Sequence, residues 1–241
     1  MQKSKPCCLV ERSNMTGYFF TFEGGEGSGK STQIRLLAEA LEAAGHPVIT
    51  TREPGGSVGA EEIRHLLVTG KADRWDDVTE TLLFFAARRD HLKSKIWPAI
   101  QKGEIVISDR FADSTMAYQG YGYGNNPKQQ TLIRTLYKEV AGDFKPDLTF
   151  LLDIPVDIGL KRSRRADNKE QRFEDKEVQF HERLRQAYLK MAQAEPDRFI
   201  IIDAQQPIMT IHQQIMQTLV NKRIFRNNKR TTPCLKNSKN R

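Results

Sequence analysis

The feature that most constrains this chain is a glycine-rich loop between a short apolar run and an amphipathic stretch. Residues 24–31 read GGEGSGKS, which fits the pattern G-x-x-x-x-G-K-[ST]. Residues 18–23 before the loop predict a buried strand, and residues 30–44 after it predict a helix. A loop in this context cradles phosphate groups, so the sequence predicts a nucleoside triphosphate site.

The residues of this loop have separable roles. Its glycines let backbone N–H groups turn inward around an oxyanion, and the following helix adds its positive end. We expect Lys30 to reach the β- and γ-phosphates and the Ser31 hydroxyl to ligate Mg²⁺. The nucleotide-binding set is Gly24, Gly25, Glu26, Gly27, Ser28, Gly29, Lys30, Ser31 and Thr32.

Strand-like and helix-like segments alternate along the rest of the chain. Strands are predicted at 18–23, 48–51, 105–108, 148–152 and 199–202. Helices are predicted at 30–44, 61–68, 79–102, 127–141, 156–165, 176–194 and 208–224. This order predicts an α/β fold, the three-layer sandwich of P-loop NTPases, with a five-stranded parallel sheet, helices on both faces and a small lid. Ligands of such sheets bind at the carboxyl ends of the strands.

Composition narrows the class of protein. The chain has 241 residues, of which 38% are hydrophobic and 28% charged, as in an ordinary soluble protein. It has no apolar run of about 18 residues and no apolar leader, so we expect a cytoplasmic protein without a membrane partner. The cysteines Cys7, Cys8 and Cys234 have neither a disulfide nor a zinc spacing.

The net charge of +8 is concentrated at one end of the chain. Eight basic residues and no acidic ones follow position 220, which leaves residues 1–220 without net formal charge. We therefore expect a disordered N-terminal extension at 1–16, one catalytic domain at 17–226 and a basic disordered tail at 227–241. Nucleic acid is not an expected partner, apart from non-specific contacts of the tail.

The third predicted strand is followed directly by Asp109-Arg110. A P-loop ATPase that activates water usually has a glutamate at the second of these positions. An arginine there suits a second phosphate group, because its planar fork can grip oxygens of both donor and acceptor. We expect Asp109 to hold Mg²⁺ with Ser31. A nucleoside monophosphate is already largely ionised at pH 7, so such an acceptor needs no general base.

Several further blocks resemble bacterial thymidylate kinases, over about residues 18–224. These are FEG at 22–24, TREPGG at 51–56, LFFAAR at 83–88, DRF at 109–111, DSTMAYQG at 113–120 and GDFKPDLT at 142–149. The resemblance implies transfer of the γ-phosphate of ATP to dTMP with Mg²⁺, in a homodimer.

The resemblance also implies site residues. Phe84 would stack on thymine, and Arg88, on the same helix face one turn later, would bind an exocyclic oxygen of the base. The acceptor phosphate would be bound by Arg52 and Arg110, and the sugar hydroxyl would lie near Glu26. Further contacts to the base are expected from Ser114, Thr115, Tyr118 and Gln119.

The loop interior holds no arginine, so the resemblance implies that a lid at about 162–175 supplies a catalytic one. Arg164 and Arg165 are the candidates, beside Lys30, Asp109 and Arg110 as the other catalytic residues. Two alternatives stay open from the sequence. One is a kinase for another pyrimidine nucleotide or deoxynucleoside. The other is a P-loop ATPase that depends on nucleic acid.

The first prediction concerns the basic tail. Deletion of residues 227–241 is expected to leave dTMP kinase activity within about twofold of the parent, because the tail lies outside the predicted domain. The same deletion is expected to weaken salt-sensitive retention on DNA. Steady-state kinetics and a heparin or DNA column measure the two effects. A large loss of kinase activity would contradict the prediction, because it would mean that the tail docks on the domain.

Overall fold

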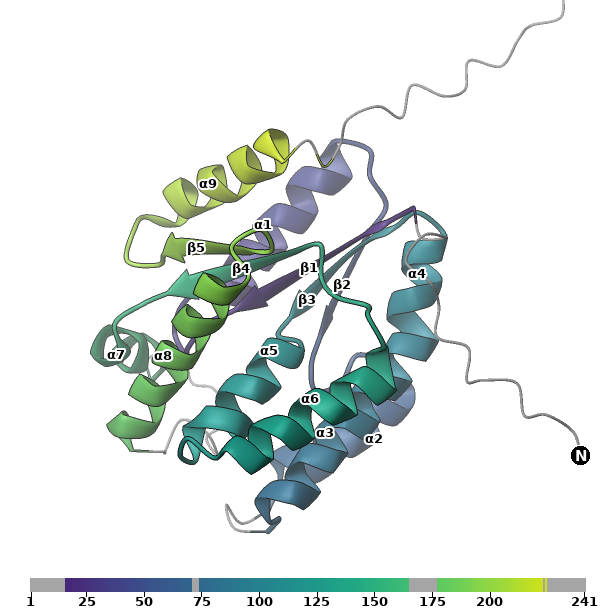
Figure 1. Ribbon diagram of the computed structural model, residues 1–241. Helices are drawn as coiled ribbons and strands as arrows, with labels where there is room; N and C mark the ends of the chain where they lie inside the picture. Colours follow the sequence, from purple (N-terminus) through teal and green to yellow (C-terminus); the bar gives the residue numbers. More distant parts are fainter. Residues whose placement is uncertain (1–15, 71–73, 165–176, 223, 225–241) are drawn as a thin grey trace, which may run out of the picture.

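The computed structural model describes residues 16–70, 74–164, 177–222 and 224. Its centre is one parallel sheet with helices on both faces (Figure 1). The strands are β1 (Tyr18–Glu23), β2 (Val48–Arg52), β3 (Ile105–Asp109), β4 (Leu148–Asp153) and β5 (Phe199–Asp203), in the order β2-β3-β1-β4-β5. The predicted five-stranded parallel sheet is therefore confirmed.

Helices connect each strand to the next, and the connections from β1 to β2 and from β3 to β4 each pass over an intervening strand. The helices are α1 (Lys30–Ala43), α2 (Val58–Val68), α3 (Asp77–His91), α4 (Trp97–Gln101), α5 (Ala112–Thr115), α6 (Pro127–Ala141), α7 (Val156–Arg164), α8 (Val178–Ala194) and α9 (Ile208–Asn221). All strand pairs are parallel, so each connection returns across a face of the sheet.

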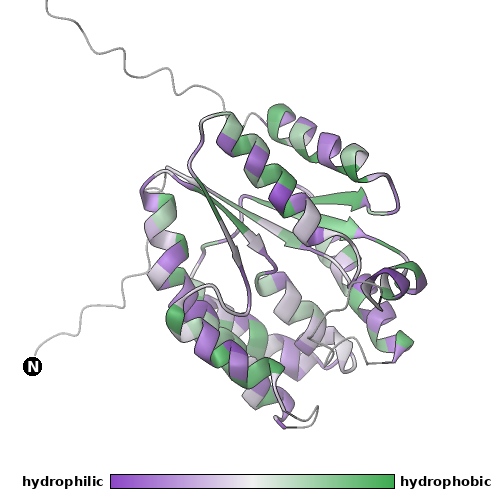
Figure 2. Cartoon of the chain, turned by 180° about the vertical axis from the view of Figure 1, so that it is seen from behind, coloured by the Kyte–Doolittle hydropathy of each residue, from purple (hydrophilic) through white to green (hydrophobic). Residues whose placement is uncertain are grey.

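One face of the sheet packs against α1 and α9. Alternate residues of β1, such as Phe20 and Phe22, lie on this face in a cluster with Leu37 of α1 and Ile215 of α9. The preceding residue, Phe19, points to the other face and lies in the opposite core, with residues of α4 and α6. Hydrophobic residues gather in the sheet, while the helices carry hydrophilic stripes (Figure 2). This alternation is expected of strands that are buried on both faces.

Two helical stretches contain π-helical segments that the sequence did not predict. The predicted helix 79–102 is α3, the π segment Leu92–Ile96 and α4 in succession. Pro98 lacks an N–H for a bond to residue 94, and the wider turn just before it takes up the mismatch. After β3, the short α5 runs into a second π segment, Met116–Gly122. Segments of this kind are frequent at functional sites.

The strands β2 to β5 each extend one residue beyond the predicted end, to a charged residue. In the backbone register of the sheet, Arg52 of β2 lies opposite Asp109 of β3, and Asp153 of β4 lies opposite Asp203 of β5. The backbone pairing continues after the apolar pattern stops, so charged side chains lie at the carboxyl edge of the sheet.

Some predictions lie outside the described residues. These are the extension at 1–15, the lid from 165 to 175 and the tail at 227–241. Within the part of the chain that the structure describes, no helix has the length and apolarity needed to cross a bilayer.

The packing of α9 gives a matched stability prediction. Ile215 is 0% exposed beneath the helix, and Ile208, at its start, is 56% exposed. Ile215→Ala is expected to lower the free energy of unfolding by about 2–5 kcal/mol, and Ile208→Ala by less than about 1 kcal/mol. Urea unfolding measures both changes. Equal losses in the two variants would contradict the packing of this face.

Candidate active site

The carboxyl edge of the sheet borders a cavity of about 700 Å³. The loop after β1, the ends of β2 and β3, and parts of α3, α5 and α7 contribute its walls. The lining includes Glu26, Gly27, Ser28, Gly29, Lys30, Ser31, Thr32, Arg52, Glu53, Pro54, Arg64, Phe84, Arg88, Asp109, Arg110, Ser114, Thr115, Tyr118 and Gln119. The structure therefore brings the donor-side and acceptor-side candidates together in one cavity.

The phosphate loop has the geometry expected of an anion cradle. Gly29 caps α1 with a φ of 89°, and no side chain caps the helix, so its first N–H groups are available to an anion. Gly27 has a φ of 66°, and a Cβ there would lie 2.0 Å from the carbonyl oxygen of Gly159 in α7. Only glycine fits at that contact, which packs the loop directly on the helix that leads to the predicted lid.

Lys30 is folded back along this loop. Its Nζ donates to the carbonyl oxygens of Gly24 and Gly25, both at 3.1 Å. Burial lowers the pKa of Lys30, and the nearby Arg110 lowers it further, while the charges of Glu26 and Asp109 oppose the shift. An anion bound in the cavity would favour the charged form of this lysine and so raise its pKa.

Ser31 and Asp109 converge from different elements. The Ser31 Oγ on α1 donates to the Asp109 Oδ2 at the end of β3, at 3.3 Å. A hydroxyl and a carboxylate oxygen this close are hard ligands of the kind Mg²⁺ prefers, with water and phosphate oxygens completing its shell. Among the described residues, no group of three or more His, Cys, Asp or Glu is placed so that it could hold a metal ion. The donor set fits a magnesium ion held partly by its nucleotide.

Arg110 has a left-handed backbone, with a φ of 67°. It is the one non-glycine residue with positive φ within the described ranges. Its N–H donates to the carbonyl of Phe22 at 3.0 Å, and its own carbonyl accepts from the Ser108 Oγ at 2.8 Å. A strained conformation held by such bonds directs the side chain away from the strand and into the cavity.

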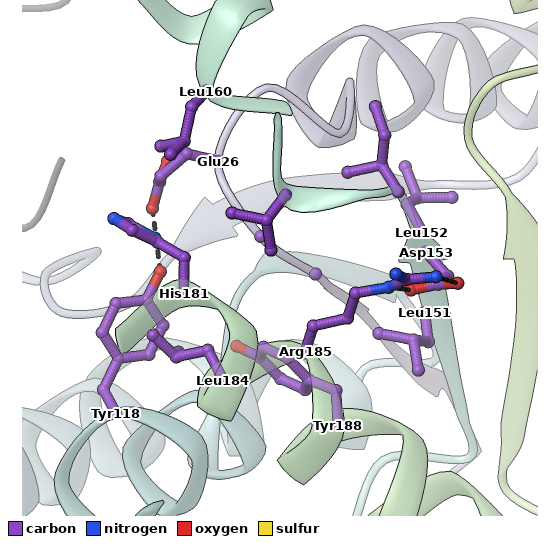
Figure 3. A pocket seen from close by; sticks show the side chains of 14 residues that line it. Glu26, Tyr118, Leu151, Leu152, Asp153, Leu160, His181, Leu184, Arg185 and Tyr188 are labelled. Carbon is purple, nitrogen blue, oxygen red and sulfur yellow. Dashed lines mark hydrogen bonds and ion pairs between the residues drawn. The ribbon is translucent and has the colours of Figure 1, made fainter. Parts of the chain in front are cut away.

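The Arg110 guanidinium is tied to the phosphate loop. Its Nη2 donates to the Glu26 Oε1 at 2.7 Å, and its Nη1 to the carbonyl of Gly24 at 3.2 Å. Glu26 also accepts from the Tyr118 hydroxyl at 2.8 Å (Figure 3). Burial alone would raise the pKa of Glu26, but Arg110, Lys30 and Tyr118 outweigh it and lower that pKa to about 2. The acid is therefore ionised at physiological pH.

Behind Glu26 lies a second, small cavity of about 20 Å³. His181, Leu184 and Arg185 of α8 border it, and Arg185 grips both carboxylate oxygens of Asp153 at 2.7 and 2.9 Å (Figure 3). This ion pair fixes α8 against the end of β4.

Phe84 and Arg88 of α3 face the main cavity. Phe84 is half-buried in its wall, whereas its neighbour Phe85 is 2% exposed and packs in the interior. Arg88 is buried, and its Nε and Nη2 donate to Glu53 at 2.8 Å and to Thr115 at 2.9 Å. The i, i+4 spacing thus does bring the two side chains to one cavity wall.

The remaining predicted substrate residues divide by their partners. Arg52 is exposed and donates to Glu61 at 3.1 Å, so it borders the mouth of the cavity. Gln119 is buried and donates to Glu80 at 2.9 Å. Thr115 is occupied by Arg88, as described above. These hydrogen bonds hold the three side chains in place in the cavity wall.

The predicted lid arginines are only partly described. Arg164 is the last residue of α7, and Arg165 lies outside the described residues. Arg162, also on the cavity wall, donates from Nη1 to the carbonyl of Ala204 at 2.8 Å. The catalytic role of Arg164 and Arg165 stays a prediction.

Sequence reasoning missed Glu23 and Tyr188. Glu23, the last residue of β1, accepts from the Phe111 N–H at 2.8 Å, the Ser114 Oγ at 2.6 Å and the Tyr188 hydroxyl at 3.1 Å. A carboxylate closing an otherwise buried strand was the available signal for Glu23. Tyr188 lies 165 residues further along the chain, in the helix predicted at 176–194, for which no site residue was predicted.

The arrangement is cationic and closely packed. Lys30, Arg52, Arg88 and Arg110 border the same cavity as the anion-binding loop. No histidine is among the residues that border it. A site of this kind can align two phosphate groups and stabilise charge between them, and an acceptor phosphate that is already ionised needs no side chain to remove a proton.

Comparison with known proteins points to one family. The family model for thymidylate kinase matches residues 22–215. A thymidylate kinase of Caulobacter vibrioides is 54% identical over 204 residues, 85% of this chain and 96% of that protein. One from Magnetococcus marinus is 50% identical, over 82% of this chain and 92% of that protein. The solved thymidylate kinase from Ehrlichia chaffeensis matches with a TM-score of 0.67 and 37% identity, over 85% of this chain and 98% of that chain.

The environment of Glu23 predicts a pH dependence of stability. Burial, with the nearby Asp113, raises the pKa of Glu23 from 4.5 to about 7. The folded protein then binds this proton more tightly than the unfolded chain, so the stabilisation is complete below pH 4.5 and lost as pH rises through about 7. Between these limits the parent is expected to lose on the order of 3 kcal/mol relative to Glu23→Gln.

Urea unfolding of the ligand-free parent and Glu23→Gln at several pH values between 4.5 and 8 measures this difference. The glutamine can accept from the Phe111 N–H and donate to the hydroxyl groups, so it serves as a neutral isostere. A difference between the two proteins that does not change with pH would refute the shifted pKa.

Proposed function

The chain belongs to the thymidylate kinase family, and we propose that its 700 Å³ cavity holds ATP and dTMP together, with Arg110 bridging the two phosphate groups. The enzyme phosphorylates dTMP to dTDP with ATP, a step in dTTP synthesis. The observation that carries the proposed roles is the strained backbone of Arg110, whose guanidinium points at the phosphate loop from the end of β3.

Donor and acceptor enter from opposite walls in this proposal. The phosphate loop, with Lys30, binds the β- and γ-phosphates of ATP, and Arg52 and Arg110 bind the phosphate of dTMP. The attacking oxygen of dTMP is already ionised at pH 7, so no side chain has to accept a proton. Arg110 is largely buried, and its bonds to Gly24 and Glu26 direct its guanidinium toward the phosphate loop.

The sugar and base of dTMP contact the other wall. We assign the thymine ring to the exposed face of Phe84 and a base carbonyl to Arg88, with Ser114, Thr115, Tyr118 and Gln119 shaping the pocket. Glu26, ionised in its surroundings, accepts a hydrogen bond from the sugar hydroxyl. A single cationic donor beside a flat apolar ring suits a pyrimidine with a carbonyl group.

Ser31 and Asp109 would hold Mg²⁺. When bound, the ion neutralises phosphate charge as a Lewis acid. The chain's own contribution is positioning, because α1 and the end of β3 bring the two oxygen ligands together.

Three further assignments are predictions. Arg164 or Arg165 supplies an additional cation over the phosphates when the lid segment closes. The chain forms a homodimer, and the enzyme acts in the cytoplasm.

Two alanine variants separate the phosphate site from the base site. Arg110→Ala is expected to lower kcat by about 100-fold or more, because it removes a donor that stabilises the transferring group. Phe84→Ala is expected to raise the KM for dTMP about tenfold with little change in kcat, since stacking stabilises ground and transition states alike. A coupled assay of ADP release measures both.

Phe199→Leu, on the distant strand β5, is a control for altered packing and should leave both constants near those of the parent. If Arg110→Ala changed only the KM for dTMP, the bridging role would be wrong. If Phe84→Ala bound dTMP as the parent does, thymine would lie elsewhere in the cavity.

A further inference from the structure

A row of polar side chains, buried except for the half-buried Thr51, runs from the cavity wall to the end of β2. It contains Arg88, Glu53, His91 and Thr51, and we call it the Arg88 relay. Glu53 is 6% exposed and His91 is 0% exposed. Arg88 and Glu53 border the cavity, whereas His91 lies behind them. Nothing in the proposed transfer of phosphate requires a buried histidine at this place.

The members of the relay contact one another in order. Arg88 Nε donates to the Glu53 Oε2 at 2.8 Å, and the other carboxylate oxygen, Oε1, lies 3.0 Å from the His91 Nδ1. The His91 Nε2 lies 2.8 Å from the Thr51 Oγ1. A carboxylate can only accept, so His91 donates from Nδ1, and in the neutral imidazole Nε2 accepts from the Thr51 hydroxyl. Each oxygen of Glu53 thus has one defined partner.

The relay leaves one nitrogen of Arg88 for a ligand. Nε is held by Glu53 and Nη2 by Thr115, while the buried Nη1 has no hydrogen-bond partner among the described residues. The guanidinium also lies over the rings of Phe85 and Phe111, 4.8 and 5.1 Å from their centroids. Because the guanidinium is planar, fixing two nitrogens fixes the direction of the third.

The loop after β2 closes over the far end of the relay. A Cβ at Gly56 would lie 2.4 Å from both the His91 Nε2 and the Thr51 Oγ1. The loop backbone is therefore packed directly on this pair. His91 has little room to reorient, so its contact with Glu53 is held in one geometry.

We propose that His91 is a positioning residue for acceptor recognition: through Glu53 it orients Arg88, so that Nη1 meets a carbonyl oxygen of the acceptor base. The inference rests on the proposed role of Arg88 in binding that base. The competing possibility is that the relay only ties β2 to α3. If His91 positions Arg88, loss of its contact with Glu53 will weaken dTMP binding. If the relay only connects β2 to α3, the same change will lower the stability of the protein and leave dTMP affinity unchanged.

Two amide variants of His91 distinguish these possibilities. Asparagine places its side-chain N–H near the position of Nδ1, so His91→Asn keeps the contact with Glu53. Glutamine reaches toward the position of Nε2, so His91→Gln keeps the contact with Thr51 and loses the one with Glu53. His212→Asn on the distant helix α9 is the control for a histidine-to-amide change.

Calorimetric titration with dTMP and steady-state kinetics are the readouts, with melting temperatures recorded for every variant. His91→Gln is expected to raise the dTMP Kd about three- to tenfold, the range expected for one net hydrogen bond. His91→Asn and His212→Asn are expected to stay within about twofold of the parent. The KM for ATP and the kcat at saturating dTMP should change little.

A double-variant cycle with Arg88→Lys completes the test, because lysine keeps the charge beside Glu53 but lacks Nη1. Adding His91→Gln to Arg88→Lys is expected to cause no further loss of dTMP affinity. The proposal is overturned if His91→Gln and His91→Asn bind dTMP equally, or if the His91→Gln effect persists unchanged beside Arg88→Lys. If Arg88→Lys itself binds dTMP like the parent, the base-binding role of Arg88 fails instead.

Discussion

The site depends on a backbone conformation that an L-amino acid adopts only at a cost. Arg110 has a φ of 67°, at the point where β3 ends and the chain turns toward α5. Its N–H is bonded to Phe22 of β1, so the neighbouring strand fixes this turn. The strain is local, and the adjacent strands β1 and β3 are largely buried and are paired on both sides. Such a frame can hold one unfavourable residue in place.

The consequence of this turn is electrostatic. The guanidinium reaches the phosphate loop and pairs with Glu26, in a position where burial would otherwise penalise both charges. Glu23 supports the turn from beneath, through the Phe111 N–H and the hydroxyls of Ser114 and Tyr188. The charged residues form a connected network before any ligand binds. Preorganisation of this kind is the main means by which proteins stabilise transferring phosphoryl groups.

Local sequence patterns predicted much of the fold and the site. The phosphate loop, the strands and the Phe84–Arg88 pair each follow from residues close together in the chain, and the structure brings these residues to one cavity. Contacts over long distances were not predictable in this way. Tyr188 meets Glu23 only because α8 packs against β4, β5 and the π segment that follows α5, and no local pattern reports such a contact. The positive φ of Arg110 was also not predicted, because arginine has no preference for that conformation.

The claim that Arg110 is held in strain is tested most directly by comparing Arg110→Gly with Arg110→Ala. Both variants lose the same guanidinium, but only glycine adopts a φ of 67° without steric cost. Urea unfolding of the two ligand-free proteins is therefore expected to find Arg110→Gly more stable than Arg110→Ala by about 1 kcal/mol. Equal stability, or a less stable glycine variant, would contradict the claim that the backbone at Arg110 is strained.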